Sequence, residues 1–168
     1  AKTGIERISF YTSHPRDYSE TTIDAMRDYP NIMPFLHLPV QSGSDEVLRR
    51  MARGYTVERY KQLYDNLKKK VPHIAFTTDL IVGFPNETDE EFEATLDLVR
   101  YCRFDMAYAF IYSPRAGTPA ANMEDNIPLE VKKERLARLN ELLTEIAEEN
   151  NRHFLGETVS VLCIGTSK

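Results

Sequence analysis

The chain has 168 residues, of which 42% are hydrophobic and 28% are charged, a balance typical of a globular protein and not of a fibrous or disordered one. With 21 Lys and Arg against 26 Asp and Glu, the formal net charge of −5 gives no global sign of nucleic-acid binding. No apolar run approaches the ~18–20 residues that span a bilayer. The start lacks a basic-then-apolar secretory leader, so we expect a cytoplasmic protein. Its two cysteines, Cys102 and Cys163, are too far apart to suggest a disulfide framework or a cysteine-built metal site.

Four short apolar runs predict strands. The last three are almost continuously apolar, as expected of parallel strands that are covered on both faces. The runs cover residues 7–11, 33–40, 75–82 and 106–112.

Helical patterns lie between these runs, and each begins at a side chain that can cap a helix. Ser19, Ser44 and Thr56 precede three of them, and Thr88 with Glu91 forms a capping box before the fourth. The order β-α-β-α-α-β-α-β predicts a parallel sheet with helical crossovers. Because a full eight-unit barrel takes about 250 residues, we expect residues 1–125 to be a partial parallel βα barrel with four βα units.

A different pattern follows Pro128, which stands where a first-turn proline is tolerated. Residues 126–155 predict one long connecting helix that ends at Gly156. Residues 157–164 alternate like a β-strand, so 156–168 are expected to start a small β-domain. The stripe expected to face inward consists of Leu129, Leu136, Leu139, Leu143 and Ile146.

The predicted strand ends carry the candidate site, because function in a βα barrel lies where the strands end and the loops begin. Each end is rich in hydroxyl, amide, glycine or proline residues, which together could line a cavity for a polar ligand. The ends are residues 12–15, 39–44, 79–85 and 112–115.

Three features of these ends have both a functional and a plain structural interpretation. The segment Gln41–Ser44 leads into a helix N-terminus, which favours anions or ribose hydroxyls, yet it is also an ordinary capped turn. Asp79 lies inside an apolar strand, where a carboxylate needs a partner or a function. Gly83 permits close backbone approach, or simply a turn.

Several charged residues have less specific interpretations. Arg53 follows a predicted helix and could return toward Gln41, or could be solvated. Residues 49–70 hold eight basic residues against two acidic ones, which could contact phosphates or form a charged outer helix face. Glu87 and the acidic residues after it are expected to be a solvated helix start. The four histidines show no metal-ligand spacing, and His14 alone stands at a strand end.

Four segments at and after the strand ends carry a specific pattern when they are taken together. They are HLPVQSGSD at 37–45, LRRMARGYT at 48–56, TDLIVGFPNET at 78–88 and YSPRAGTPAA at 112–121. In this order, over nearly the whole chain, they resemble the radical-SAM methylthiotransferase family.

The resemblance implies a partial βα barrel that uses S-adenosylmethionine and two 4Fe–4S clusters, one to generate a radical and one to deliver sulfur. Segments 12–15 and 113–121 are most similar to the branch that methylthiolates C2 of N6-isopentenyladenosine at position 37 of the tRNA anticodon loop. That branch implies tRNA as substrate partner and an electron donor such as flavodoxin. Residues 156–168 resemble the lead into the family's RNA-binding TRAM β-domain.

The same resemblance assigns cofactor-binding positions. Gln41 would contact the ribose or methionine part of S-adenosylmethionine, Arg53 its carboxylate and Asp79 a ribose hydroxyl. These pairings agree with the chemistry, because a guanidinium suits a carboxylate and a carboxylate suits a diol. Ser42 and Gly83 are weaker matches to the same set. No catalytic residue and no metal ligand is assigned.

One departure is clear: the Cys-x-x-x-Cys-x-x-Cys motif that would ligate the radical cluster is absent. We therefore expect a C-terminal fragment of such an enzyme, inactive alone and with an exposed apolar sheet edge. Alternatives in the same fold are relatives that modify a ribosomal-protein aspartate or another adenosine. A cluster-free nucleotide- or RNA-binding partial barrel, or a barrel enzyme for a phosphorylated metabolite, would belong to other classes.

Overall fold

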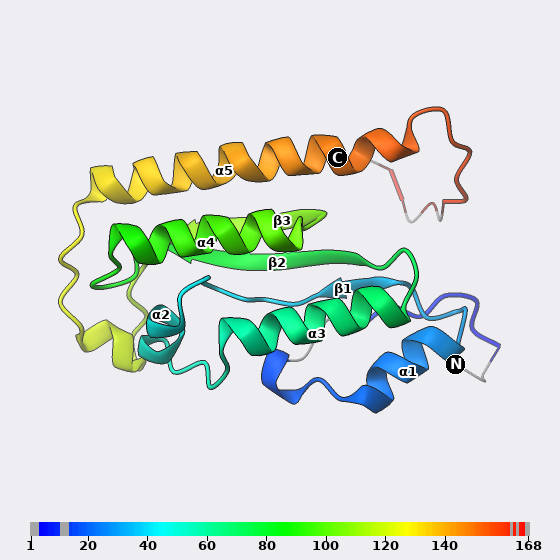
Figure 1. Ribbon diagram of the computed structural model, residues 1–168, viewed down its shortest axis with the longest axis horizontal. Coiled ribbons are helices and arrows are strands. Elements are labelled where there is room, and N and C mark those ends of the chain that lie inside the picture. Colours follow the sequence, from blue (N-terminus) through cyan, green and yellow to red (C-terminus); the bar gives the residue numbers. More distant parts are fainter. Residues whose placement is uncertain (1–3, 11–13, 162, 164, 167–168) are drawn as a thin grey trace.

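The computed structural model describes residues 4–10, 14–161, 163 and 165–166. Helices and strands alternate through most of the chain, and a long helix follows them (Figure 1). The helices and strands are α1 (Glu20–Asp28), β1 (Phe35–His37), α2 (Asp45–Arg50), α3 (Val57–Lys70), β2 (Ala75–Val82), α4 (Asp89–Cys102), β3 (Met106–Ile111) and α5 (Leu129–Asn151).

The strands form one parallel sheet in the order β1-β2-β3. The predicted strand 75–82 is confirmed as β2, the central strand, and β3 ends one residue before the predicted 106–112. In register, Leu36 lies opposite Phe76, and Thr78 lies opposite Ala107. The predicted α/β class with parallel strands and helical crossovers is thus confirmed.

The first two predicted strands are shorter than expected. In the described part of 7–11, the only ladder contact is a single parallel bridge between Ile8 and Ile32, while Tyr11 lies outside the described residues. Of the predicted strand 33–40, only β1 forms. Pro34 and Pro39 lie on either side of β1 and have no N–H to donate to a neighbouring strand. The described sheet therefore has three strands rather than four.

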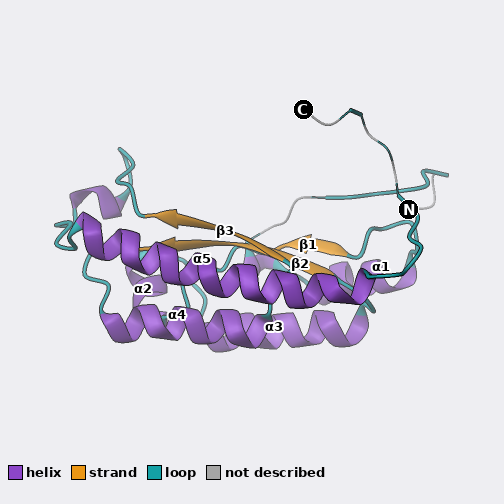
Figure 2. Cartoon of the chain, turned by 90° about the horizontal axis from the view of Figure 1, so that it is seen from above, coloured by secondary structure: helices purple, strands orange, loops and turns teal. Residues whose placement is uncertain are grey.

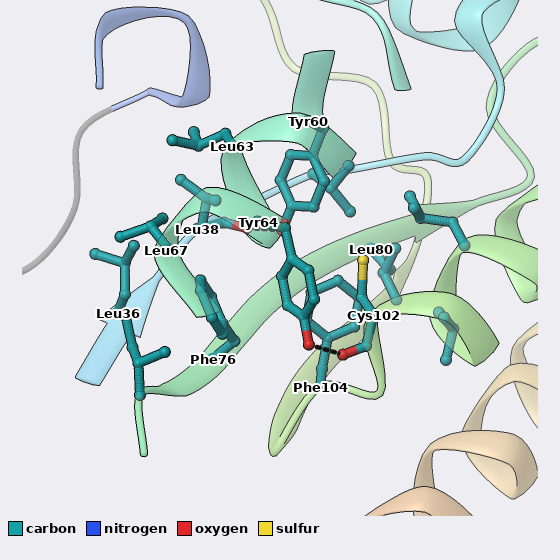
Figure 3. Close-up of a cluster of buried hydrophobic side chains, with 14 of the residues drawn as sticks. Leu36, Leu38, Tyr60, Leu63, Tyr64, Leu67, Phe76, Leu80, Cys102 and Phe104 are labelled. Carbon is teal, nitrogen blue, oxygen red and sulfur yellow. Dashed lines mark hydrogen bonds between the residues drawn. The ribbon is translucent and has the colours of Figure 1, made fainter. Parts of the chain in front are cut away.

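The helices gather on one side of the sheet, as the turned view shows (Figure 2). Figure 3 shows the core between α3 and the strands, where Tyr60 and Tyr64 pack among leucine and phenylalanine side chains. Both phenols find partners: Tyr60 Oη donates to the carbonyl of Leu38 at 2.8 Å, and Tyr64 Oη donates to the carbonyl of Cys102. This core packs one face of the sheet against the helices and leaves side chains on the other face of β3 exposed.

The helix starts follow the predicted caps. The side chains of Ser19, Ser44 and Thr56 each accept a backbone N–H from the first turn of the helix that follows. At α4 both halves of the capping box form, since Glu91 N donates to Thr88 Oγ1 at 3.2 Å and Thr88 N donates to the Glu91 carboxylate at 2.9 Å. At α2 and α4 these local interactions place the helix start shortly after the end of a strand segment.

The expectation that β3 is covered on both faces is wrong. Alternate residues Met106, Tyr108 and Phe110 are each 51% exposed, whereas the intervening ones pack toward α5. The reason is that every helix contacting the sheet lies on the same side. An apolar run alone does not tell a strand covered on both faces from one covered on a single face.

The long helix is confirmed as α5, followed by a short 3₁₀ turn to Phe154. Leu139 and Ile146 are buried as predicted, but Leu129 is 56% exposed. The described residues of the predicted strand 157–164 form no strand and are exposed, so a β-domain at 156–168 stays a prediction. None of the helices in the described ranges combines the length and apolarity that a bilayer crossing requires.

The two cysteines should differ in reactivity if this core forms. Cys102 is fully buried, and burial raises the pKa of its thiol to about 12, whereas Cys163 is exposed. Because the thiolate is the nucleophile, we expect one thiol per chain to react rapidly with Ellman's reagent at pH 8. The second should react only in denaturant. Two rapidly reacting thiols in the native protein would contradict the packing at Cys102.

Candidate functional site

An open cleft of about 680 Å³ lies at the carboxyl ends of the strands. Its lining joins the end of β2 to the loops after the predicted second strand, after α2 and after β3. It thus contains three of the five predicted cofactor-binding residues. The lining residues used below are His14, Gln41, Arg53, Asp79, Phe84 and Tyr112.

Gln41 ends the extended segment that continues β1. Its N–H donates to the carbonyl of Asp79 at 2.8 Å and its carbonyl accepts from Ile81 at 2.9 Å, so β2 holds its backbone from both sides. Its φ of 73° is in the left-handed region, which costs a non-glycine residue ~1 kcal/mol or more. The side-chain amide lines the cleft and makes no hydrogen bond with the described residues. It is held in place and has free donors and acceptors.

Arg53 reaches the cleft because the chain reverses after α2. Ala52 and Gly54, on either side of it, both have positive φ, at 55° and 70°. The Arg53 guanidinium makes no hydrogen bond or ion pair in the described part of the chain. Burial lowers the pKa of His14, and the positive charges of the adjacent Arg53 and Arg16 lower this pKa further. This end of the cleft therefore offers an uncompensated cation.

Asp79 points from β2 into the open face of the sheet. Its carboxylate is 30% exposed and lies 3.5 Å from His37 Nε2 on the neighbouring strand. His37 in turn shares a 2.9 Å hydrogen bond between Nδ1 and Thr77 Oγ1. Asp79 also borders a smaller hollow of about 220 Å³ beside His37 and Tyr108. The carboxylate thus has one weak partner and remains accessible from the cleft.

Ser42 and Gly83, the two weaker candidates, do not line the cleft. Ser42 is fully buried, with its hydroxyl 3.3 Å from Thr95 Oγ1 and accepting the N–H of Ser44 at 3.1 Å. Gly83 has a φ of 70°, and a Cβ on it would lie 2.5 Å from Cγ of Lys132. Both residues lie behind the cleft lining, and a contact of either with a cofactor stays a prediction.

The expectation that Glu87 is solvated is wrong. Glu87 is 4% exposed, and its Oε2 accepts from Gly83 N and from Arg135 Nη1, both at 2.8 Å. Burial raises the pKa of this carboxyl group. Helix periodicity could not reveal the pair, because Arg135 comes from α5, far along the chain. Asp89 in the same acidic run is largely exposed, as predicted.

Most of the basic run at 49–70 is already partnered. The interpretation as a charged outer helix face fits it better than a phosphate-binding patch, since three of its cations pair with carboxylates and two lie over aromatic rings. The contacts are Arg49 with Glu46, Arg50 with Glu91, Lys70 with Glu20 and Asp24, Lys61 over the ring of Tyr101, and Lys68 over that of Tyr64.

Phe84 and Tyr112 lie in strand ends that were expected to line a cavity, and both form walls of the cleft, a role that was predicted for neither. Phe84, 3% exposed, packs edge-on against Tyr112 with ring centroids 5.0 Å apart. Tyr112 is held in turn by a 2.9 Å hydrogen bond from its hydroxyl to the carbonyl of Ala120. The aromatic character of residues just after strands is the signal that could have found them. Across the described ranges, no group of three or more His, Cys, Asp or Glu side chains could hold a metal ion.

Comparison with known proteins agrees with this geometry. The sequence profile of the Radical SAM superfamily matches residues 1–99. The chain belongs to the radical SAM superfamily. It is 56% identical over 167 residues to the tRNA-2-methylthio-N(6)-dimethylallyladenosine synthase of Geobacillus kaustophilus, covering 99% of this chain and 32% of that protein. The protein of the same name from Bacillus subtilis is 54% identical over 167 residues, with 99% and 33% covered.

The fold of this chain is also similar to that of a solved structure. Coproporphyrinogen III oxidase (HemN) of Escherichia coli, described as a radical SAM enzyme, superposes with a TM-score of 0.66 at 24% identity. The match covers 83% of this chain and 32% of the HemN chain. The likeness shows a shared radical-SAM fold. The chain spans about a third of the length of the curated relatives it matches.

Gly43 should be irreplaceable in the turn between Gln41 and α2. A Cβ there would lie 2.3 Å from the carbonyl oxygen of Ala94 and 2.5 Å from Cα of Thr95, both backbone atoms of α4. Gly43→Ala should therefore lower the free energy of unfolding by about 3 kcal/mol, measured by urea denaturation. Gly117→Ala is the control, since its φ is 85° but its surroundings are open, and should cost about 1 kcal/mol. Equal losses would refute the close approach of α4.

Proposed function

We propose that the cleft binds S-adenosylmethionine, in a longer radical SAM enzyme that methylthiolates tRNA. The observation that carries the proposal is the joint presence of an unpaired guanidinium, an unpaired amide and an accessible carboxylate in one cleft. Membership of the superfamily and identities of 54–56% to tRNA-modifying relatives support it. The chain's own contribution is to bind and orient this cofactor.

Each polar group has a matching part of the cofactor. Arg53 supplies the cation for the methionyl carboxylate, and Asp79 accepts hydrogen bonds from a ribose hydroxyl. Gln41 can donate to and accept from the ribose or the methionine part. Ser42 and Gly83, which were expected to contact the cofactor, act by shaping the turns around these three residues. Aromatic walls from Phe84 and Tyr112 exclude water from one side.

The residues present do not fit an iron–sulfur cluster. Thiolates are the expected ligands, and Cys102 is buried in the core, remote in the chain from exposed Cys163. We propose that cysteines outside this sequence hold the two 4Fe–4S clusters of the longer protein, and that this chain alone is inactive. When bound in the complete enzyme, the radical cluster would supply the electron that cleaves S-adenosylmethionine.

For the substrate, we propose C2 of N6-isopentenyladenosine at position 37 of the tRNA anticodon loop. The shared name of the relatives favours this adenosine over a ribosomal-protein aspartate. A one-electron donor such as flavodoxin and a cytoplasmic location follow from the same reaction. Residues 156–168 would then lead into a TRAM-like RNA-binding domain.

The cofactor assignment is tested in the complete enzyme with S-adenosylmethionine and equilibrium dialysis. Arg53→Gln should weaken binding about 10- to 100-fold, the loss expected for a charge-assisted contact. Asp79→Asn should weaken it about 10-fold. Arg59→Gln is the control, because Arg59 is exposed on α3 and does not line the cleft. Unchanged affinity in Arg53→Gln would overturn the cofactor assignment.

The substrate assignment is tested by mass spectrometry of nucleosides from bulk tRNA. A strain without the parent gene should lack 2-methylthio-N6-isopentenyladenosine and accumulate N6-isopentenyladenosine. The parent gene on a plasmid should restore the modification. An unchanged nucleoside profile, in cells with no second enzyme for this step, would remove tRNA as substrate and favour the aspartate-modifying alternative.

A further inference from the structure

The loop of residues 83–87, which joins β2 to α4, forms one wall of the cleft through Phe84. Its turn is closed by two hydrogen bonds: Glu87 N donates to the carbonyl of Phe84 at 2.9 Å, and Gly83 N donates to Glu87 Oε2 at 2.8 Å. The conformation of this wall therefore depends on where the Glu87 carboxylate is held.

That carboxylate is held from α5. Arg135 Nη1 donates to Glu87 Oε2 at 2.8 Å and to the Glu87 carbonyl at 3.1 Å, while Nη2 donates to Asp89 Oδ1 at 2.7 Å. The side chains of Glu87 and Arg135 are 1% and 7% exposed, so water screens the pair little. Glu87 Oε1 and Arg135 Nε have no partner among the described residues. Arg135 is thus the cation that compensates a buried charge.

Two further contacts tie the same part of the chain to the loop. Asn126 Oδ1 accepts from Asn86 N at 3.0 Å, and Asn126 Nδ2 donates to Asn86 Oδ1 at 2.9 Å. The stem of Lys132 covers Gly83, and its ammonium group lies 5.7 Å from the ring centroid of Tyr112, the second aromatic wall. The start of α5 and the segment before it therefore contact the loop on the side away from the cleft and hold it in place.

We propose that Arg135 is a positioning residue for the cofactor cleft, acting through Glu87 on the 83–87 loop and so on the wall formed by Phe84. The inference rests on the proposed function, since it concerns the same cleft. Arg135 does not line the cleft, so its effect on a ligand there must pass through the loop.

The chemistry of the pair explains why loss of Arg135 would move the loop. Burial raises the pKa of Glu87, while the Gly83 N–H and Arg135 oppose that rise. Glu91, which faces it from α4, adds to the rise. Without Arg135 the carboxylate would be left buried without its cation, and it would either take up a proton or turn toward water. Either change weakens the bond to Gly83 N that closes the turn.

The test measures binding of S-adenosylmethionine to the complete enzyme by equilibrium dialysis. Circular dichroism first confirms that every variant is folded. Arg135→Gln should raise the Kd about tenfold, the size of effect expected when about one hydrogen-bonded contact with the ligand is lost. Arg138→Gln is the matched control on the same helix, because Arg138 pairs with Glu93 at a position that is 45% exposed. The Kd of Arg138→Gln for S-adenosylmethionine should equal that of the unaltered enzyme. Arg135→Lys keeps the positive charge but lacks the planar set of N–H donors of a guanidinium, and it should give an intermediate Kd.

The outcomes separate this inference from the proposed function. If the unaltered enzyme fails to bind S-adenosylmethionine, the proposed function fails. If it binds and Arg135→Gln binds equally well, with only a lower melting temperature, then Arg135 stabilises the fold without positioning the cleft, and the inference is wrong. A raised Kd for Arg135→Gln, partly recovered in Arg135→Lys and absent in Arg138→Gln, supports it.

Discussion

The alternation of side chains along β2 is the constraint on which the rest of this structure depends. Leu80 and Val82 point toward the helices and are fully buried, whereas Asp79 and Ile81 point to the open face and border the cleft. Because the side-chain period of a strand is two, a shift of one residue would bury the carboxylate and expose the core. Parallel pairing on both edges of β2 prevents that shift. The same pairing holds Gln41 at the end of its neighbour.

The polar groups in the cleft differ from those behind its wall in whether they have partners within the chain. Arg53 and the Gln41 amide are left free, and Asp79 has only a weak contact to His37. Glu87, Arg135 and Lys132, which lie behind the wall, are buried and partnered: Glu87 bonds to Arg135 and to the Gly83 N–H, and Lys132 pairs with Asp125. Free polar groups in a cleft bind ligands, while a buried and paired set holds its surroundings in one geometry. The structure thus separates the groups that face a ligand from those that support them.

The limits of prediction are equally specific. Helix starts were predicted well, because a cap such as that of Thr88 and Glu91 acts within one turn of chain. Strand lengths were predicted poorly where Pro34 and Pro39 remove ladder donors, and where Ile8 makes a single bridge. The three strongest site residues converge on one cleft as predicted, since strand ends meet at one edge of a parallel sheet.

The sequence by itself determined the α/β class, the positions of the helices and the residues that lie at the strand ends, because caps, periodicity and strand order are properties of short segments. Only the tertiary structure decided that Glu87 is buried against Arg135, that Ser42 turns away from the cleft and that β3 is covered on one face. These outcomes depend on α4 and α5 packing beside residues distant in the chain. No local pattern encodes the identity of such a neighbour.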